Sequence, residues 1–230
     1  VAKKPPFKGK FEWAIDYYKS MAKKLNITMK LGKEVTAQEV LALKPHSILV
    51  ATGSNVISIP LEGLDQVQTV QAHDVLANDM QFANKKVVVI GGGITGLETA
   101  LYINRQGTNQ VSVVDMLPEW PVDMLDMRYQ NEALLEVRHC NDQGVALFYN
   151  NKVVKFADGK LFIESTKDGE VKELPADVIV LSVGVKPNDA LWQELLASGH
   201  PSVWKAGDAI ATGKINKAVL HGSKFGYSLN

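Results

Sequence analysis

The sequence predicts an α/β fold in which buried parallel strands alternate with helices. Residues 86–115 read KVVVIGGGITGLETALYINRQGTNQVSVVD, so a strand, a glycine turn, a helix and a second strand follow one another within 30 residues. Residues 177–183, DVIVLSV, form another short run that is almost entirely apolar. Such runs are typical of strands that a parallel sheet buries on both faces, and their alternation with helices indicates βαβ units.

The part of the chain before this unit is expected to contain helices and short strands. Apolar side chains between Phe11 and Leu25 recur at helical spacing, which predicts an amphipathic helix. Thr36 with Glu39 three residues later is the capping-box pattern that begins a helix, and Lys44-Pro45 ends it. The other expected elements are strands over 27–31 and 46–51, a loop over 54–65 and a short helix over 73–77.

After this unit, an antiparallel ribbon is expected between two further helices. Asp158-Gly159 and Asp168-Gly169 are hairpin turn signals, which pair the strands on either side of them. The predicted elements are a helix over 126–141, strands over 145–149, 152–156, 160–165 and 170–174, a helix over 190–198, a strand over 203–206 and a last helix over 214–229.

Composition excludes several classes of protein. The chain has 25 Lys and Arg against 25 Asp and Glu, and this balance argues against nucleic acid or an anionic membrane as partner. No apolar run approaches the ~18–20 residues that span a bilayer. The N-terminal residues lack the apolar segment of a signal peptide, so a cytoplasmic protein is expected. The single Cys140 excludes an internal disulfide, an iron–sulfur cluster and a dithiol pair. The five histidines lack metal-ligand spacing, so neither a metal site nor a catalytic nucleophile is expected.

The glycine turn is the strongest functional signal. Gly91, Gly93 and Gly96 fit G-x-G-x-x-G, where the first glycine allows the tight turn, the second admits a diphosphate and the third permits close helix packing. The free N–H groups that open the following helix favour phosphate binding. The predicted dinucleotide contacts are therefore Gly91, Gly92, Gly93, Ile94, Thr95 and Gly96. The alternative is a glycine-rich turn that binds no nucleotide.

An acid follows the second strand at the position that the dinucleotide fold uses for ribose recognition. Asp115 comes about 20 residues after the last glycine, where a carboxylate accepts hydrogen bonds from the adenosine ribose and repels a 2′-phosphate. From 111 to 127 there is no Lys or Arg, and the other acids there are Glu119, Asp123 and Asp126. The sequence therefore favours NAD(H) over NADP(H).

Two weaker signals gain meaning beside this turn. Thr52-Gly53 ends a predicted strand, although an ordinary strand-ending turn explains it equally. Asp208, in Ala206-Gly207-Asp208-Ala209, could bond a sugar or ribityl hydroxyl, but it could instead be a helix N-cap.

Six motifs, in order over nearly the full length, resemble the C-terminal reductase region of the NADH:flavin oxidoreductases related to 2,4-dienoyl-CoA reductase and Old Yellow Enzyme. That region belongs to the wider class of FAD/NAD(P) pyridine-nucleotide reductases. The motifs are MKLGKEVT (29–36), ILVATGS (48–54), IPLEGLD (59–65), VVVIGGGITGLETA (87–100), SVGVKPN (182–188) and AGDA (206–209).

The resemblance implies two nested Rossmann-like, three-layer domains. Residues 1–60 and 185–230 would form a partial FAD domain, and residues 61–184 an inserted NAD(P) domain that includes the antiparallel ribbon. It further implies that Thr52 and Gly53 mark a crossing between the domains. Gly207 and Asp208 would bind the FAD ribityl chain, and Gly184 would lie near the nicotinamide. Glu98 would line the nicotinamide pocket, or else face solvent as an acid that the helix dipole favours.

One departure from the family pattern is large. The FAD domain of the family opens with its own glycine fingerprint, whereas this sequence holds one fingerprint, in the NAD position. Together with the N-terminal Val, this predicts a piece of a longer protein. The parent would also carry a flavin barrel and, in the dienoyl-reductase branch, an iron–sulfur cluster. NADH is therefore expected to bind this chain, and FAD to bind the full-length parent.

The function that follows is that of a flavin-linked oxidoreductase domain. NADH would pass a hydride to FAD, which would feed an FMN-containing enoate or 2,4-dienoyl-CoA reductase module in the parent. The alternatives are a nucleotide-binding fragment without activity alone, and part of an NADH oxidase or ferredoxin reductase.

Overall fold

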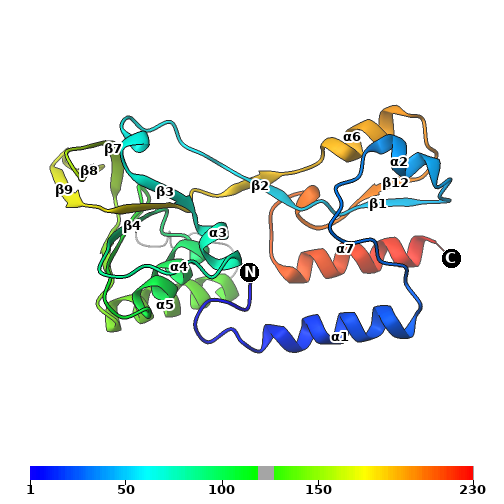
Figure 1. The fold of residues 1–230 in the computed structure, drawn as a ribbon, viewed down its shortest axis with the longest axis horizontal. Coiled ribbons are helices and arrows are strands. Elements are labelled where there is room, and N and C mark those ends of the chain that lie inside the picture. Colours follow the sequence, from blue (N-terminus) through cyan, green and yellow to red (C-terminus); the bar gives the residue numbers. More distant parts are fainter. Residues whose placement is uncertain (119–126, 230) are drawn as a thin grey trace. The chain divides into compact units, whose positions relative to one another are not determined.

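The computed structural model describes residues 1–118 and 127–229, and the chain within it divides into two compact units. The first unit comprises Val1–Asn26 and Ser58–Val183, and the second comprises Ile27–Ile57 and Gly184–Asn230 (Figure 1). The chain therefore passes between the units at 26/27, 57/58 and 183/184.

A five-stranded parallel sheet forms the centre of the first unit. Its order is β3-β10-β4-β5-β6, and every neighbouring pair is parallel. The strands are β3 (Gln68–Gln71), β10 (Val178–Leu181), β4 (Lys86–Ile90), β5 (Gln110–Val114) and β6 (Ala146–Phe148). The carboxyl ends of all five strands consequently lie along one edge, and this confirms the predicted α/β fold.

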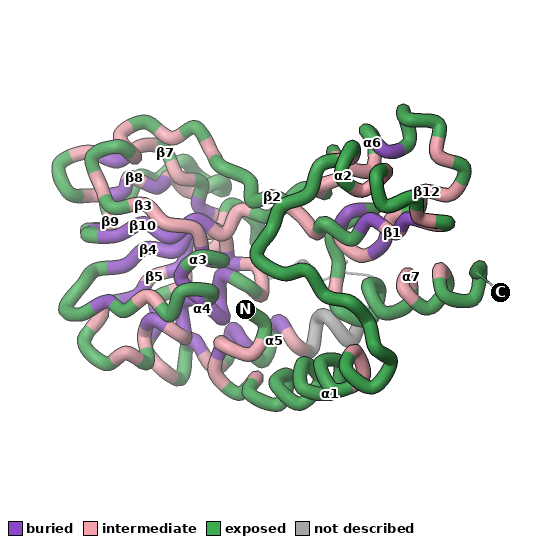
Figure 2. The backbone as a smooth tube through the Cα atoms, turned by 45° about the vertical axis from the view of Figure 1, so that its right-hand side comes forward, coloured by how far each residue is buried: buried purple, intermediate pink, exposed green. Residues whose placement is uncertain are grey.

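The two faces of this sheet are covered differently. Val87 and Val89 belong to one buried cluster with residues of α3 (Ala72–Ala77), α4 (Ile94–Asn104) and α5 (Met127–Asp142). Val88 and Ile90 belong to a second buried cluster with Leu161, which lies in a separate, antiparallel sheet. Because side chains alternate along a strand, β4 is buried on both faces (Figure 2). The first unit therefore has three layers.

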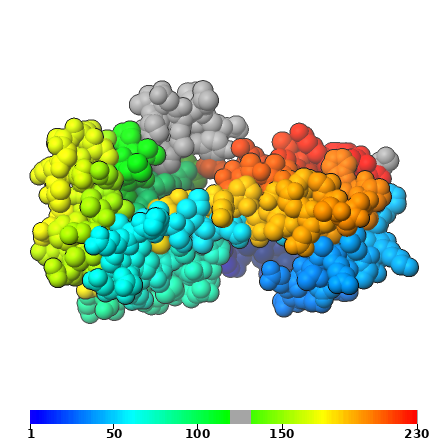
Figure 3. Space-filling model, turned by 90° about the horizontal axis from the view of Figure 1, so that it is seen from above, coloured from blue at the N-terminus to red at the C-terminus, as the bar shows by residue number. Residues whose placement is uncertain are grey.

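The antiparallel sheet contains three of the four strands predicted for the ribbon, because the strand expected over 145–149 is β6, which pairs in parallel with β5 instead. It has the order β7-β8-β9, formed by β7 (Asn151–Ala157), β8 (Lys160–Ser165) and β9 (Val171–Pro175). Gly159 and Gly169 have positive φ in the two turns, as the hairpin signals require. The outer side chains of the ribbon form a continuous surface, yellow-green in Figure 3.

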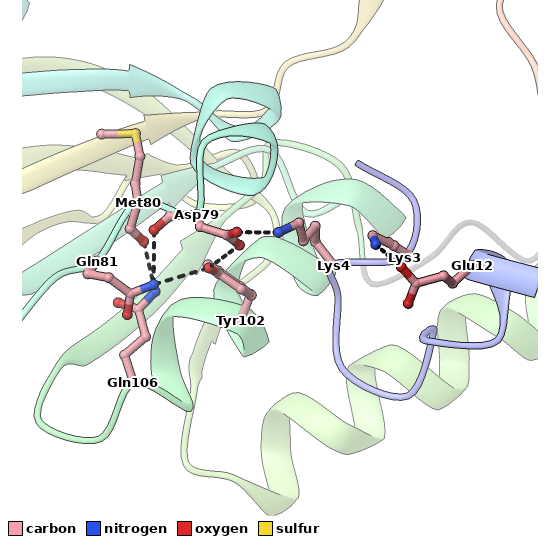
Figure 4. Close-up of polar contacts among 8 residues, drawn as sticks. All are labelled: Lys3, Lys4, Glu12, Asp79, Met80, Gln81, Tyr102 and Gln106. Atoms are coloured by element: carbon pink, nitrogen blue, oxygen red, sulfur yellow. Dashed lines mark hydrogen bonds and ion pairs between the residues drawn. The ribbon is translucent and has the colours of Figure 1, made fainter. Parts of the chain in front are cut away.

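The N-terminal segment belongs to the first unit, whereas the sequence assigned residues 1–60 to the partial FAD domain. Lys4 pairs with Asp79, which also accepts a hydrogen bond from the Tyr102 hydroxyl at 3.1 Å (Figure 4). Phe7 stacks on His139 with the ring centroids 4.8 Å apart. These long-range contacts explain the different assignment, because no local pattern encodes them. The other two boundaries lie within three residues of the expected ones.

The predicted first helix is α1 (Phe11–Lys24), and none of its residues is buried. Its exposed side chains include Trp13, Ile15 and Tyr18.

The second unit is built on two strand pairs. β1 (Ile48–Val50) pairs in parallel with β12 (Val203–Lys205), and β2 (Ser54–Val56) pairs antiparallel with β11 (Val185–Pro187). Its helices are α2 (Ala37–Ala42), α6 (Ala190–Ala197) and α7 (Ile215–Ser228). The capping box is present, since Thr36 Oγ1 accepts from the Glu39 amide and Glu39 accepts from the Thr36 amide.

Several short elements differ from expectation. Residues 27–31 form no strand, and Leu31 is 82% exposed, because no neighbouring strand among the described residues supplies a ladder. The segment expected to be a loop over 54–65 begins with β2 and ends in the short helix η1 (Leu64–Gln66). β3 and β11 were not predicted, since three or four residues carry too little periodicity.

Candidate functional site

The glycine turn joins β4 to α4 at the carboxyl edge of the parallel sheet. Gly91 has φ of +107°, in the region that glycine tolerates and other residues rarely adopt. A Cβ at this position would lie 2.3 Å from the Ser182 carbonyl oxygen. Gly91 therefore has to be glycine on both conformational and steric grounds.

Gly93 and Gly96 differ in what surrounds them. A Cβ on Gly93 would meet no atom of the described residues within 4 Å, so within that part of the chain the space before the N-terminus of α4 is open. A Cβ on Gly96 would lie 1.9 Å from the Gly91 carbonyl oxygen, so the helix packs directly on the turn. Gly93 is the N-cap of α4, and the N–H groups of the next three residues, Ile94, Thr95 and Gly96, have no acceptor within the helix. This end of α4 can receive a diphosphate.

Asp115 lies against this turn, directly after β5. Its Oδ2 accepts a hydrogen bond from the Gly92 amide at 2.6 Å, and its Oδ1 accepts one from the Leu117 amide at 2.8 Å. A carboxylate oxygen accepts more than one hydrogen bond, so both oxygens keep capacity for ribose hydroxyls. The acid and the phosphate-binding turn are thus adjacent, as the fingerprint requires.

The turn and the acid lie where the strand order reverses. β5 and β6 lie on one side of β4, and β10 and β3 lie on the other. Ligands of open α/β sheets bind at such a point, outside the carboxyl ends of the strands. The Ser182 amide, just after β10, donates to the Ile90 carbonyl at 2.8 Å and brings the two strand ends together.

Glu98 is buried on α4, which contradicts the solvent-facing alternative. It pairs with Lys8, and Lys8 also lies 3.0 Å from a Glu132 oxygen. Burial raises the pKa of Glu98, and the Lys8 ammonium offsets part of that rise. Lys8 itself has a raised pKa despite its burial, because its hydrogen bonds to Glu98 and Glu132 outweigh desolvation. Lys8 therefore keeps its positive charge readily, because two acids bond it. Glu98 ionises less readily than an exposed acid, because the effect of burial exceeds that of the one cation beside it.

The weaker motifs all lie in the second unit. Thr52 Oγ1 donates to the Asn188 carbonyl at 2.5 Å, and the Asn188 amide donates to the Gly53 carbonyl at 3.0 Å. Gly184, with φ of +99°, accepts from the Ile57 amide at 3.1 Å. The Thr52-Gly53 turn is therefore bonded to the segment that carries β11.

Asp208 lies within the short helix η2 (Gly207–Ala209) and closes the loop that follows it. Its Oδ1 accepts from the Gly213 amide at 3.0 Å, and Ser54 Oγ donates to its Oδ2 at 3.5 Å. The N-cap of the next helix, α7, is Lys214, so Asp208 is not the helix N-cap that the alternative supposed. Gly207 precedes it with φ of +61°, and its amide donates to His221 Nδ1 at 3.2 Å.

The described residues suit NAD(H) better than FAD. The open space at Gly93 and the α4 N-terminus could receive a diphosphate, and Asp115 could accept ribose hydroxyls. Residues 1–118 and 127–229 contain no second strand–glycine turn–helix unit for the FAD diphosphate. Glu119, Asp123 and Asp126, which supported NAD(H) in the sequence, lie outside the described residues.

Other chemistries find little support in the described part of the chain. It holds no group of three or more His, Cys, Asp or Glu that could bind a metal ion. Cys140 is buried, and burial raises the pKa of its thiol to about 12, so a reactive thiolate is disfavoured. Among the described helices, none combines the length and apolar character that crossing a membrane demands.

Sequence reasoning missed two residues beside the site. The ring of Tyr149, directly after β6, lies beside Gly92, and Lys8 pairs with Glu98. Neither belongs to a motif, because the tertiary fold alone brings them to the turn and to α4.

Comparison with known proteins gives concordant results. The profile of the family described as pyridine nucleotide-disulphide oxidoreductase matches residues 11–220. A bilirubin reductase of Mediterraneibacter gnavus (strain CC55_001C) is 32% identical over 188 residues, which cover 82% of this chain and 28% of the relative. An NADH oxidase of Thermoanaerobacter brockii is 29% identical over 237 residues, covering 100% of this chain and 35% of the relative.

A solved structure of a 2-naphthoyl-CoA reductase complex superposes with a TM-score of 0.86 at 27% identity, over 98% of this chain and 33% of that one. The chain thus spans about a third of the length of these relatives.

Proposed function

The chain belongs to the pyridine nucleotide-disulphide oxidoreductase family, and from that premise we propose that it is the NADH-binding part of a longer flavin-dependent oxidoreductase. The observation that carries the proposal is the Asp115 carboxylate held 2.6 Å from the Gly92 amide, beside the open space at Gly93. A diphosphate acceptor and a ribose acceptor then lie at one strand edge, as NADH requires.

Each part of the site has a separate task in NADH binding. The amides that open α4 hold the diphosphate with the positive end of the helix dipole. Asp115 accepts the adenosine ribose hydroxyls, and its negative charge repels the 2′-phosphate of NADPH. The protein would contribute binding and orientation, and a flavin, when bound, would supply the hydride-accepting chemistry.

The flavin side of the proposal rests on the family and on the length of its relatives. The described residues contain no second glycine turn that could bind the FAD diphosphate, so that turn would come from the rest of a longer protein. Thr52, Gly53, Gly184, Gly207 and Asp208 are proposed to contribute to the FAD domain. The names of the relatives, a bilirubin reductase and a 2-naphthoyl-CoA reductase, support an enoate or 2,4-dienoyl-CoA type of acceptor module. The FMN and the iron–sulfur cluster of that module are proposed from the family resemblance of the sequence motifs.

A second candidate is a nucleotide-binding piece that turns nothing over alone. The single glycine cradle among the described residues favours it, since NADH would bind without a flavin to reduce. The NADH oxidase relative keeps a third candidate open, an oxidase or ferredoxin reductase domain.

Titration of the purified chain with NADH, followed by the quenching of its tryptophan fluorescence, tests the proposal. We expect saturable NADH binding that is tighter than NADPH binding. Reduction of an artificial dye by NADH, with and without added FAD, then separates the oxidoreductase from the inactive piece. Absence of NADH binding would contradict the proposal.

A further inference from the structure

We propose that Tyr149 is a positioning residue whose ring packs beside Gly92 and keeps the Gly92 amide bonded to Asp115, in the arrangement that selects NADH over NADPH. The inference rests on the proposed function and deepens it. It adds a residue that neither contributes to the fingerprint nor accepts a ribose hydroxyl.

Gly92 has little free space around it. A Cβ at Gly92 would lie 3.1 Å from Tyr149 Cε1, 3.2 Å from Asp115 Cβ and 3.3 Å from Asp115 Oδ2. The middle glycine is therefore enclosed by the tyrosine ring and the aspartate together. Even one methyl group there would push the ring or the carboxylate out of place.

The backbone couples the positions of Tyr149 and Asp115. The Asp115 amide donates to the Phe148 carbonyl at 3.0 Å, and the Asn151 amide donates to the Asp115 carbonyl at 2.9 Å. The Asn150 amide donates to the Leu117 carbonyl at 2.9 Å. Residues on both sides of Tyr149 are thus bonded to the segment that carries the acid.

The ring is itself anchored. Tyr149 is half-buried and packs against the core cluster that α4 and α5 share with the sheet. Core packing restricts a side chain to few rotamers, so the ring has a fixed position beside the turn.

The fixed position of the Tyr149 ring affects which coenzyme the site prefers. The Gly92 and Leu117 amides fix the two carboxylate oxygens, and the Tyr149 ring occupies space beside the same turn. When the Asp115 carboxylate is held in this orientation, its negative charge faces the position that the 2′-phosphate of NADPH would occupy. Once the ring is removed, the Gly92 peptide can shift into the space it leaves, which weakens the bond from the Gly92 amide to Asp115 Oδ2 and lowers the discrimination.

The test measures the dissociation constants of NADH and NADPH for the wild type, Tyr149→Ala and Tyr149→Phe. Loss of a well-placed hydrogen bond to a charged group costs about tenfold in affinity. Because Tyr149→Ala would release the Gly92 peptide whose amide bonds Asp115, we expect it to lower the preference for NADH by up to about that factor. Tyr149→Phe should keep the preference, because it keeps the ring.

Two further variants guard against loss of folding. Tyr102→Ala is the matched control, since Tyr102 packs against the same core cluster and contacts Asp79 rather than the turn. It should lower the unfolding midpoint and leave the NADH-to-NADPH ratio unchanged. Tyr149→Leu keeps apolar bulk in the core but lacks the ring, and it should lose selectivity as Tyr149→Ala does.

The outcomes separate the inference from the proposed function. If the wild type binds NADH and both Tyr149→Ala and Tyr149→Leu keep its ratio, the inference is wrong and the proposed function stands. If Tyr149→Phe loses as much selectivity as Tyr149→Ala, the ring is not the cause and the inference is again wrong. If the wild type binds neither coenzyme, both fall together.

Discussion

Lys8 and Glu98 form an ion pair that fixes the N-terminal segment on helix α4 of the first unit. The same segment places the Phe7 ring against His139 and 4.3 Å from the guanidinium carbon of Arg105. Phe7 has φ of +69°, a backbone conformation that costs energy for a residue with a large side chain. The contacts of this segment therefore compensate for local strain.

Replacement of Lys8 by Met should destabilise the first unit. It would leave the buried Glu98 carboxylate without the cation that lies closest to it, and an unpaired buried polar group costs about 1–3 kcal/mol. Urea unfolding followed by circular dichroism measures the change. Lys10→Met is the control, because Lys10 is exposed and should change the free energy of unfolding little. Equal effects of the two variants would contradict the role of the ion pair.

The buried position of Glu98 also predicts a pH dependence. Because burial raises its pKa in the folded state, the native protein binds more protons than the unfolded chain in the window just above pH 4.5. Stability contributed by this group is therefore lost as pH rises through that window. The difference in unfolding free energy between wild type and Glu98→Gln should fall as pH increases there. A difference that is flat or rises with pH would show that Glu98 ionises normally.

Asp115→Asn should weaken NADH binding by about tenfold, the effect of removing a charged hydrogen-bond acceptor. NADPH binding should change less or improve, because the repulsion of the 2′-phosphate disappears. Isothermal titration with each coenzyme measures both constants. Adding a basic residue through Asp115→Arg should move the preference further towards NADPH. Unchanged NADH affinity in Asp115→Asn would remove this residue from the site.

Gly93→Val and Gly96→Val make a matched pair. A Cβ at Gly93 would meet no described atom within 4 Å, so the fold should survive while the diphosphate space is filled and NADH binding is lost. At Gly96 the Cβ would lie 1.9 Å from the Gly91 carbonyl, so the second variant should lose the fold itself. Thermal unfolding and NADH titration of both variants distinguish the two effects. A Gly93→Val protein that binds NADH normally would contradict the assignment.

The elements that could be predicted from the sequence are those with local signals. The apolar runs at 86–90 and 178–181 became β4 and β10, and Thr36 with Glu39 formed its capping box. The glycine turn and Asp115 were predicted because the dinucleotide fold fixes their spacing along the chain. Their adjacency in space follows from parallel pairing of β4 and β5.

The remaining features depend on contacts that no local pattern encodes. β2 and β11 have three residues each and exist because they pair with one another. Residues 27–31 have strand-like composition, yet they stay irregular without a partner among the described residues. The positions of Lys8 and Tyr149 depend on packing against α4 and against the glycine turn. A sequence pattern carries the period of an element but not the identity of its neighbours.

The most direct test of the central claim is a crystal structure of the chain with NADH bound. We expect the diphosphate against the amides of Ile94, Thr95 and Gly96, with both adenosine ribose hydroxyls within hydrogen-bond distance of the Asp115 carboxylate. NADH bound elsewhere, or an adenosine ribose without contact to Asp115, would contradict this claim.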